Sequence, residues 1–271
     1  ILGIAANNEK IVNYARKKNI IIIEDNCEGL GAKLNNKHLG TYGDFGTYSF
    51  FYSHQITSGE GGMITCHNKE DYEILVSLRS HGWSRSNNKN EYKKVAKKYP
   101  KLDPRYIFIN QGFNLRPTDV QAAMGLNQFE RLDKFINIRA DNRRKIIQSL
   151  KKDPRWKNQY RFIEIPKNIE PSFMGLPIFL NESMTKEIKM KLLFYLESEG
   201  IETRPILTGN FLNQPSIKLF GLNNKNLKFK GAQSIEDLGF LIGLHTKEIN
   251  QKQLSLIKNS LLFIDSLSKD F

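Results

Sequence analysis

The chain of 271 residues is poor in cysteine, and this scarcity excludes two kinds of protein. Its two cysteines, Cys27 and Cys66, are too few for a disulfide framework or for a cysteine-ligated iron–sulfur cluster. The five histidines show neither an HExxH motif nor another spacing typical of metal ligands. We therefore expect no disulfide scaffold, no metal site and no iron–sulfur cluster.

Long apolar runs are also missing. No stretch reaches the roughly 18 apolar residues that a membrane-spanning helix needs. The first residues lack the basic region and the cleavage site of a signal peptide. We therefore expect a cytoplasmic protein without a membrane partner. The chain also lacks an initiator methionine and opens almost directly in a predicted helix, so we expect that the beginning of its first domain is missing.

Acidic residues are outnumbered by basic ones, which leaves a formal net charge of +13. Such a charge could indicate a nucleic-acid partner, because basic surfaces neutralise phosphates. The lysines are, however, spread along predicted helices without the interleaved aromatic residues of a single-strand binder. We interpret them as a solvated surface, with a phosphate-bearing small substrate as the second interpretation, and we expect no nucleic-acid partner.

The order of predicted elements in the first half indicates an α/β fold. The pattern predicts a helix over residues 9–18, followed by a strand that contains the isoleucines 20–23 and is buried on both faces. A helix followed by an all-apolar strand is typical of a mixed, mostly parallel sheet. The stretches GTYSFFYS and GGMITC predict two further strands, and Asn68 is a good N-cap for the next helix.

Residues 87–106 are polar and contain two prolines, which predicts a long loop. From Pro117 the pattern predicts one very long helix, bent near Gly125. Further on, the pattern predicts strands over 161–165, 175–180 and 201–206, and helices over 185–200, ended by Gly200, and 250–267. We therefore expect a large α/β domain over residues 1–150 and a small α+β domain over residues 151–271.

Polar side chains follow two of the predicted strands, where ligands bind in open parallel sheets. Glu24, Asp25 and Glu28 follow the isoleucine strand, and Ser49 and His54 follow the next. Taken alone, an acidic pair at a strand end is more often a helix cap or a surface ion pair. A single strand serine is likewise more often an ordinary polar residue.

Three motifs in order, EDNCEGLGA, GDFGTYSFFYSHQITSGEGGM and GFNLRPTDVQAAMGLNQ, resemble the sugar-nucleotide aminotransferases of the DegT/DnrJ/EryC1/StrS type. These pyridoxal 5'-phosphate enzymes have an aspartate-aminotransferase-like fold. The resemblance implies that Asp25 contacts the pyridine nitrogen of the cofactor, where a carboxylate keeps this nitrogen protonated. It also implies that Glu28 approaches the ring hydroxyl and Ser49 the cofactor phosphate. Asn114 would reach the cofactor phosphate of the neighbouring subunit, which implies a homodimer with shared active sites.

The family carries its cofactor-binding lysine five residues after this serine, where this chain has His54. A lysine would capture the cofactor aldehyde as an imine, whereas histidine can act only as a base near neutral pH. The exchange resembles the 4-keto-6-deoxy-sugar 3-dehydratase branch, with pyridoxamine 5'-phosphate held non-covalently and His54 as the catalytic base. The branch often has a second histidine next, where Gln55 stands here. The alternatives are a nucleotide-sugar aminotransferase homologue, or an inactive binding protein whose lysine drifted to histidine.

The branch has two subclasses. One carries an iron–sulfur cluster on cysteines downstream of the histidine, a region that has no cysteine here beyond Cys66. The other resembles this chain in the motifs HGW and ETRPILTGN, uses glutamate to restore the cofactor amine, and acts on GDP-4-keto-6-deoxy-D-mannose in the synthesis of colitose for lipopolysaccharide. Candidates for binding sugar or glutamate are therefore His81, Glu202, Arg204 and Asn210. His81 could instead interact with the dipole at a helix C-terminus.

Overall fold

The computed structural model describes residues 1–84, 89–221 and 228–267. The chain forms two compact units. The first comprises Ala5–Leu132 with Ile1 and Asn168–Glu170, and the second comprises Leu2–Ile4, Asp133–Lys167 and the chain from Pro171 onward. Within the described ranges, no helix is both long enough and apolar enough to cross a membrane.

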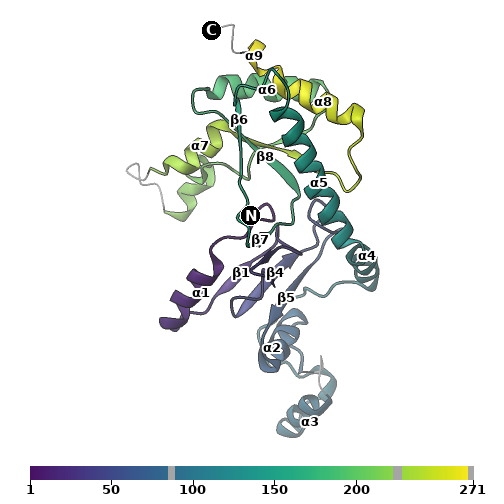
Figure 1. Cartoon of the computed structure of the whole chain (residues 1–271). Coiled ribbons are helices and arrows are strands. Elements are labelled where there is room, and N and C mark those ends of the chain that lie inside the picture. Colours follow the sequence, from purple (N-terminus) through teal and green to yellow (C-terminus); the bar gives the residue numbers. More distant parts are fainter. Residues whose placement is uncertain (85–88, 222–227, 268–271) are drawn as a thin grey trace. The chain divides into compact units, whose positions relative to one another are not determined.

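The first unit is built on a three-stranded sheet in the order β1-β4-β5 (Figure 1). Strand β1 (Ile23–Asp25) runs parallel to β4 (Phe45–Ser49), and β4 pairs in the antiparallel sense with β5 (Gly62–Cys66). Helix α1 (Asn8–Lys17) precedes β1. It buries Val12 and Ala15, which are spaced i, i+3 and therefore lie on one helical face. The predicted helix and the two strands predicted after the isoleucine stretch are thus confirmed.

The prediction that the isoleucine strand is buried on both faces is wrong. Ile20, Ile21 and Ile23 are 54%, 71% and 65% exposed. The regular strand begins only at Ile23, and within the part of the chain that the structure describes, β1 has a hydrogen-bonded neighbour on one side only. Apolar composition indicated the burial, but the position of a strand in its sheet decides it.

A small hairpin that the sequence did not predict follows β1. Strands β2 (Lys33–Leu34) and β3 (Lys37–His38) pair with each other, and β2 also pairs with β7 (Ile169–Glu170). The hairpin contributes to a small apolar cluster formed by Val12, Ala32, Leu34, Leu39 and Tyr42. It thereby holds the chain around residues 39–43 against α1 and β1.

Helix α2 (Lys69–Arg79) begins as predicted, because the side chain of Asn68 accepts a hydrogen bond from the backbone N–H of Asp71. The prediction of a loop over residues 87–106 is wrong for most of that range. Residues 89–98 form helix α3 (Lys89–Lys98), and a 3₁₀ turn η2 (Pro104–Tyr106) follows, whereas residues 85–88 lie outside the described ranges. Residues 89–98 contain no proline or glycine and several strong helix formers, and this local propensity outweighs their polarity.

The single long helix predicted from Pro117 is two helices, α4 (Asp119–Phe129) and α5 (Leu132–Lys151). The side chain of Thr118 caps the start of α4. The break falls after Phe129 and not near Gly125, and the Arg131 guanidinium bonds back to the carbonyl of Asn127 in the last turn of α4.

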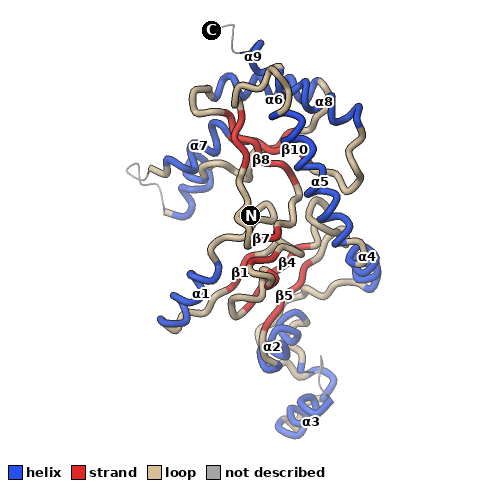
Figure 2. The backbone as a smooth tube through the Cα atoms, viewed as in Figure 1, coloured by secondary structure: helices blue, strands red, loops and turns tan. Residues whose placement is uncertain are grey.

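The second unit contains a four-stranded antiparallel sheet with helices beside it (Figure 2). Its strands, in spatial order, are β6 (Tyr160–Phe162), β8 (Gly175–Leu180), β10 (Gly239–Gly243) and β9 (Thr203–Arg204). The helices are α6 (Lys186–Ser198), α7 (Lys230–Leu238), α8 (Gln251–Leu262) and α9 (Ile264–Leu267), with 3₁₀ turns η3 (Phe211–Asn213) and η4 (Pro215–Phe220). Gly200 follows α6 with φ +80°, so the predicted helix stop is confirmed.

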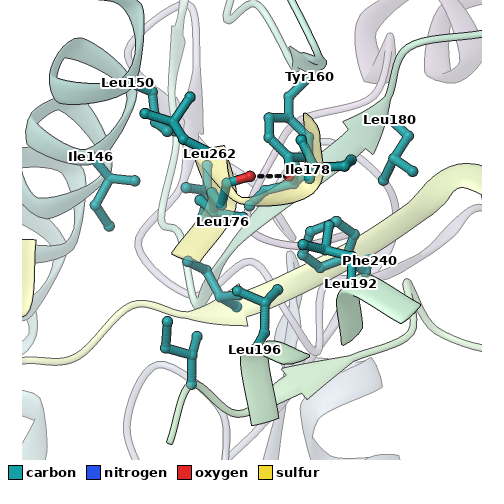
Figure 3. Packing of buried hydrophobic residues seen from close by; sticks show 14 of the residues in the cluster. Ile146, Leu150, Tyr160, Leu176, Ile178, Leu180, Leu192, Leu196, Phe240 and Leu262 are labelled. Carbon is teal, nitrogen blue, oxygen red and sulfur yellow. Dashed lines mark hydrogen bonds between the residues drawn. The ribbon is translucent and has the colours of Figure 1, made fainter. Parts of the chain in front are cut away.

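A large apolar core lies inside the second unit (Figure 3). Leu176 and Ile178 of β8, Leu192 of α6 and Phe240 of β10 are fully buried in it. The hydroxyl of Tyr160 donates to the carbonyl of Leu261 at 2.7 Å, which satisfies the one polar group of that side chain inside the core. Each fully buried leucine contributes about 1.5–3 kcal/mol, so the second unit has a core of its own.

Candidate active site

Glu24, the first carboxylate of the acidic stretch, is buried and used for structure. Its Oε1 accepts from the backbone N–H of Gly43 at 2.7 Å and from that of Tyr42, and its Oε2 accepts from the N–H of Gly40 at 3.0 Å and the Asn8 amide at 2.8 Å. Charge-assisted hydrogen bonds of this kind are the strong ones in proteins. Glu24 therefore ties α1 and the following loop to β1 and is not available to a ligand.

Asp25, the next residue, lies on the opposite face of the strand and is exposed. Its Oδ1 accepts from the backbone N–H of Cys27 at 3.2 Å. Hydrogen bonds from the Cys27 thiol and N–H lower the pKa of Asp25 from its ordinary value of 3.8. Burial, followed by the contact with Asp25, raises the pKa of the Cys27 thiol to about 11. The result is an exposed carboxylate that stays ionised at neutral pH, beside a thiol that stays protonated.

Ser49 lies at the same edge of the sheet as Asp25. Asp25 is opposite Thr47 in the parallel pair of β1 and β4, and Ser49 is the last residue of β4. The carboxyl ends of parallel strands share one edge, so the two side chains are delivered to the same side of the sheet. The Ser49 hydroxyl accepts from the backbone N–H of Phe51 at 3.2 Å, which orients its oxygen at the start of the following turn.

His54 lies in a turn that is closed by backbone hydrogen bonds. Phe50 donates to the carbonyl of Gly61 at 2.8 Å and accepts from the N–H of Ser58 at 3.0 Å, and His54 itself donates through its N–H to Phe51. The imidazole meets the ring of Phe51 edge to face, with centroids 5.6 Å apart. Its Nδ1 is buried and has no hydrogen-bond partner among the described residues. A buried nitrogen without a partner is costly, so it is kept where a ligand or a reaction uses it.

Gln55 joins this turn to the segment after β1. Its side chain is only 2% exposed, and its Nε2 donates to the backbone carbonyl of Glu28. The neighbour of His54 is thus anchored beside Glu28, whose side chain is half-buried. Together with the strand register, this contact gathers Asp25, Glu28 and the His54 turn at one edge of the sheet. The sequence signalled Gln55 only as a departure from a motif, not as an anchor.

His81 and Asn114 are brought together from different motifs. Ser80 and Asn114 form an antiparallel bridge, and the N–H of His81 donates to the carbonyl of Phe113 at 2.8 Å. His81 has φ +61°, a left-handed conformation that is uncommon for residues other than glycine. The two residues therefore lie in neighbouring backbone segments, although the sequence suggested separate roles for them.

An aromatic and cationic cluster that the sequence did not predict adjoins His81. The Arg116 guanidinium lies 5.4 Å from the ring of Trp83, and the rings of Trp83 and Phe108 stack with centroids 5.9 Å apart. The imidazole of His81 meets Trp83 edge to face at 5.7 Å. His81 and Trp83 belong to the HGW stretch, Arg116 belongs to the GFNLRP stretch, and Phe108 lies just before the latter. Nothing in these stretches alone indicates that the residues meet.

The remaining candidates, Glu202, Arg204 and Asn210, lie in the second unit. Arg204 and Glu202 form an exposed ion pair with each other. Asn210 is buried, and its amide is used within the unit: it caps η3 by accepting from the N–H of Leu212 and donates to Gln233 at 3.0 Å. The ion pair is thus accessible to a ligand, whereas the side chain of Asn210 holds local structure.

The sequence motifs at this sheet edge lie within the range that a protein-family model matches. The model of the DegT/DnrJ/EryC1/StrS aminotransferase family matches residues 1–259. The chain belongs to the DegT/DnrJ/EryC1/StrS aminotransferase family. The sequence expectation of family membership is thus confirmed.

One curated member of the DegT/DnrJ/EryC1/StrS family is GDP-4-keto-6-deoxy-D-mannose 3-dehydratase of Escherichia coli. This chain is 34% identical to it over 251 residues, which cover 92% of this chain and 62% of that protein. A solved structure of the E. coli enzyme with bound hydrated PLP matches with a TM-score of 0.78 and 30% identity, over 96% of this chain and 65% of that one. A solved structure of a GDP-4-keto-6-deoxymannose-3-dehydratase with a trapped PLP-glutamate geminal diamine matches with a TM-score of 0.77 and 28% identity, over 96% of this chain and 66% of that chain. The predicted α/β fold of PLP aminotransferases is confirmed.

Proposed function

We propose that the full-length protein is a 3-dehydratase dependent on pyridoxal or pyridoxamine 5'-phosphate. It removes the C3 hydroxyl group of GDP-4-keto-6-deoxy-D-mannose, and glutamate restores the cofactor amine. The observation that carries the proposal is His54, which stands at the family's lysine position with a buried, unpartnered Nδ1. No lysine lies between Lys37 and Lys69 that could replace the missing amine. The product would enter the synthesis of a 3,6-dideoxysugar, colitose, for lipopolysaccharide O antigen.

The residues at the sheet edge fit the cofactor. Asp25 offers an exposed, ionised carboxylate to the pyridine nitrogen, and Ser49 offers a hydroxyl to the phosphate. Glu28 would lie by the ring hydroxyl, and Asn114, which is exposed, would reach the phosphate of the partner subunit's cofactor. When bound, the cofactor supplies an amine and a ring that accepts electrons.

His54 would move the proton that the loss of water requires. Its Nδ1 has no partner in the described part of the chain, so this nitrogen would accept the proton released at C4′ of the bound cofactor without breaking a protein hydrogen bond. The resulting imidazolium can then donate the proton to the C3 hydroxyl oxygen, which leaves as water. Phe51, edge to face with the imidazole, limits the ring orientations.

The other candidates would bind sugar or glutamate. The planar fork of Arg204 suits a carboxylate or a phosphate, and Glu202 holds the guanidinium in the free protein. Asn210 would contribute by shaping η3, which its side chain caps. His81 would contact the nucleotide sugar. We further propose a homodimer that works in the cytoplasm, a compartment that suits the free cysteines Cys27 and Cys66.

The decisive experiment substitutes His54 in the full-length protein. With GDP-4-keto-6-deoxymannose, glutamate and cofactor, the natural protein should release ammonia and form a 3-deoxy sugar. His54→Asn should lower this rate by about 10²-fold or more, since general acid–base catalysis contributes about that much. His54→Lys should abolish dehydration. An amino sugar formed by the natural protein would favour an aminotransferase, and tight binding without turnover would favour an inactive binding protein.

Borohydride reduction in the presence of pyridoxal 5'-phosphate provides a test that does not depend on activity. The natural protein should release its cofactor on denaturation, because histidine forms no imine. His54→Lys should retain it covalently on the peptide that contains residue 54, as mass spectrometry would show. Cofactor attached to the natural protein at this turn would contradict the role proposed for His54.

A further inference from the structure

We infer that Gln55 is a positioning residue, whose side-chain amide holds the imidazole of His54 in a fixed place relative to Asp25. The inference rests on the proposed function, in which His54 moves a proton and Asp25 contacts the cofactor. A lysine at position 54 would be tied to the cofactor by its own imine. Histidine forms no such bond, so contacts within the protein must place its ring.

Gln55 is the first buried residue after the exposed tip of the turn. Tyr52 and Ser53 are exposed, whereas Gln55 and Ile56 are 2% and 3% exposed. Among the described residues with the largest fully buried side chains, Gln55 is the polar one. Burying an amide is costly unless it makes hydrogen bonds, and an apolar side chain of the same size would pack without that cost. The glutamine is therefore explained by what its amide holds and not by packing.

The partner of this amide belongs to a rigid part of the first unit. Nε2 of Gln55 donates to the carbonyl of Glu28. The next residue, Gly29, closes a tight turn by donating its N–H to the carbonyl of Asn26 at 3.1 Å. The N–H of Asn26 in turn donates to Thr47 of β4 at 3.0 Å. A Cβ on Gly29 would lie 1.9 Å from Oδ1 of Asn26, so this turn is closely packed. The amide thus ties the His54 turn to the strands that build the sheet edge.

The other contacts of the imidazole do not provide this tie. Phe51, which the imidazole meets edge to face, belongs to the same turn and moves with it. Nδ1 of His54 has no hydrogen-bond partner in the described ranges. Gln55 is one peptide unit away, with its Cα about 3.8 Å from that of His54. A shift of Gln55 is therefore passed directly to the imidazole.

Gln55→Met in the full-length protein tests the inference, because methionine has a similar length and shape but no hydrogen-bond donor. Displacing a catalytic group by about 1 Å can lower a rate by about 10²-fold. We therefore expect kcat for dehydration to fall by about 10- to 100-fold. KM for the nucleotide sugar should change much less, since Gln55 is buried and acts through His54. A raised KM with an unchanged kcat would contradict the inference.

Gln55→Glu separates positioning from packing through its pH dependence. Glutamate has nearly the same shape as glutamine, but only its protonated form can donate to the carbonyl of Glu28. Burial raises the pKa of a carboxyl group, so the protonated form becomes populated as the pH falls toward that raised value. The activity of Gln55→Glu, relative to the natural protein at the same pH, should therefore rise as the pH falls. A ratio that does not change with pH would count against the donor role of Gln55.

Gln159→Met is the matched control in the second unit. Gln159 is 3% exposed, and its Nε2 donates to the carbonyl of Arg155 at 2.9 Å. The substitution removes the same kind of donor from a similarly buried position, so it should lower stability without changing kcat or the pH profile. The fluorescence of Trp83 verifies that the first unit of each variant is folded. Equal losses of kcat in Gln159→Met and Gln55→Met would overturn the inference.

Imine trapping addresses the same question without turnover. In full-length protein with His54→Lys, the introduced amine should react with pyridoxal 5'-phosphate, and borohydride fixes the product. Adding Gln55→Met should slow the labelling of the peptide that contains residue 54 by about 10-fold, because the reaction depends on orientation. Adding Gln159→Met should not slow it. Equal labelling rates with and without Gln55→Met would refute the positioning role. A natural protein that forms no 3-deoxy sugar, while labelling still depends on Gln55, would contradict the proposed function instead.

Discussion

At the scale of single residues, Glu24 and Asp25 show how neighbours of the same chemical type acquire different roles. Glu24 is buried and accepts hydrogen bonds from the N–H groups of Gly40, Tyr42 and Gly43, so its charge stabilises the loop that contains them. Asp25 is exposed and receives its stabilisation from Cys27, which lowers the pKa of the carboxyl. Strand alternation alone sends the side chain of Glu24 inward and that of Asp25 to the exposed face.

Removing the Cys27 thiol should raise the pKa of Asp25. Cys27→Ala deletes the side-chain donor, the largest cause of the lowered pKa, whereas Cys27→Ser keeps a hydroxyl donor. A carboxyl with a lowered pKa stabilises the fold above its ordinary value of 3.8, and this contribution is lost as the pH falls through its folded-state pKa. Cys27→Ala should therefore lose it at higher pH than the natural protein. A carbon-13 NMR titration of Asp25 measures the midpoints, and equal midpoints in both proteins would contradict the role of the thiol.

At the scale of elements, Glu24 connects pieces that have few apolar contacts of their own. It joins the start of α1, the end of β1 and the loop at residues 40–43, beside a core cluster of only a few residues. Ile23 of strand β1 and the isoleucines 20 and 21 before it are exposed, and β1 has one paired edge in the described structure, so hydrophobic burial contributes little there. The hydrogen bonds of the Glu24 carboxylate therefore contribute more than apolar contacts to fixing the end of β1.

Glu24→Gln should destabilise the first unit by about 1–3 kcal/mol, because its amide group would place N–H donors against backbone N–H donors. Asp25→Asn, one residue away and exposed, should cost less than about 0.5 kcal/mol. Urea unfolding followed by the fluorescence of Trp83, in a Trp156→Phe background, measures both values. Equal effects of the two substitutions would show that Glu24 has no special anchoring role.

At the scale of the whole molecule, the two units have cores of very different size. The second unit buries leucines and isoleucines from β8, α5, α6 and α8 around Phe240 (Figure 3). The first unit has a small apolar cluster and holds the cofactor-binding candidates Asp25 and Ser49 and the catalytic candidate His54. The sole tryptophans of the 271 residues, Trp83 and Trp156, report on one unit each.

Leu192→Ala should lower the stability of the second unit by about 2–5 kcal/mol, because it opens a cavity in a fully buried part of α6. Phe194→Ala is the matched control on the same helix, since Phe194 is 78% exposed, and it should have little effect. Unfolding monitored by Trp156 in a Trp83→Phe background gives both values. A loss for Phe194→Ala as large as for Leu192→Ala would contradict the assigned core.

Local signals in the sequence were sufficient for many elements and for the family. The caps at Asn68 and Gly200 act within a turn of their own helices, so short patterns predict them. Such signals failed for α3, where helix propensity outweighed polarity, and for the break between α4 and α5, which falls after Phe129 and not near Gly125. The motifs around Asp25, Ser49 and His54 likewise sufficed to predict the family and the sheet edge.

The sequence by itself therefore determined which chemical groups the protein has, above all an imidazole where the resemblance places the lysine of the family's aminotransferases. Only the tertiary structure decided which of them meet: Glu24 with its loop, Gln55 with Glu28, and Ser80 with Asn114. These contacts join residues that are distant along the chain. They depend on strand register and on the closure of long loops, and no local pattern encodes either before the chain has folded.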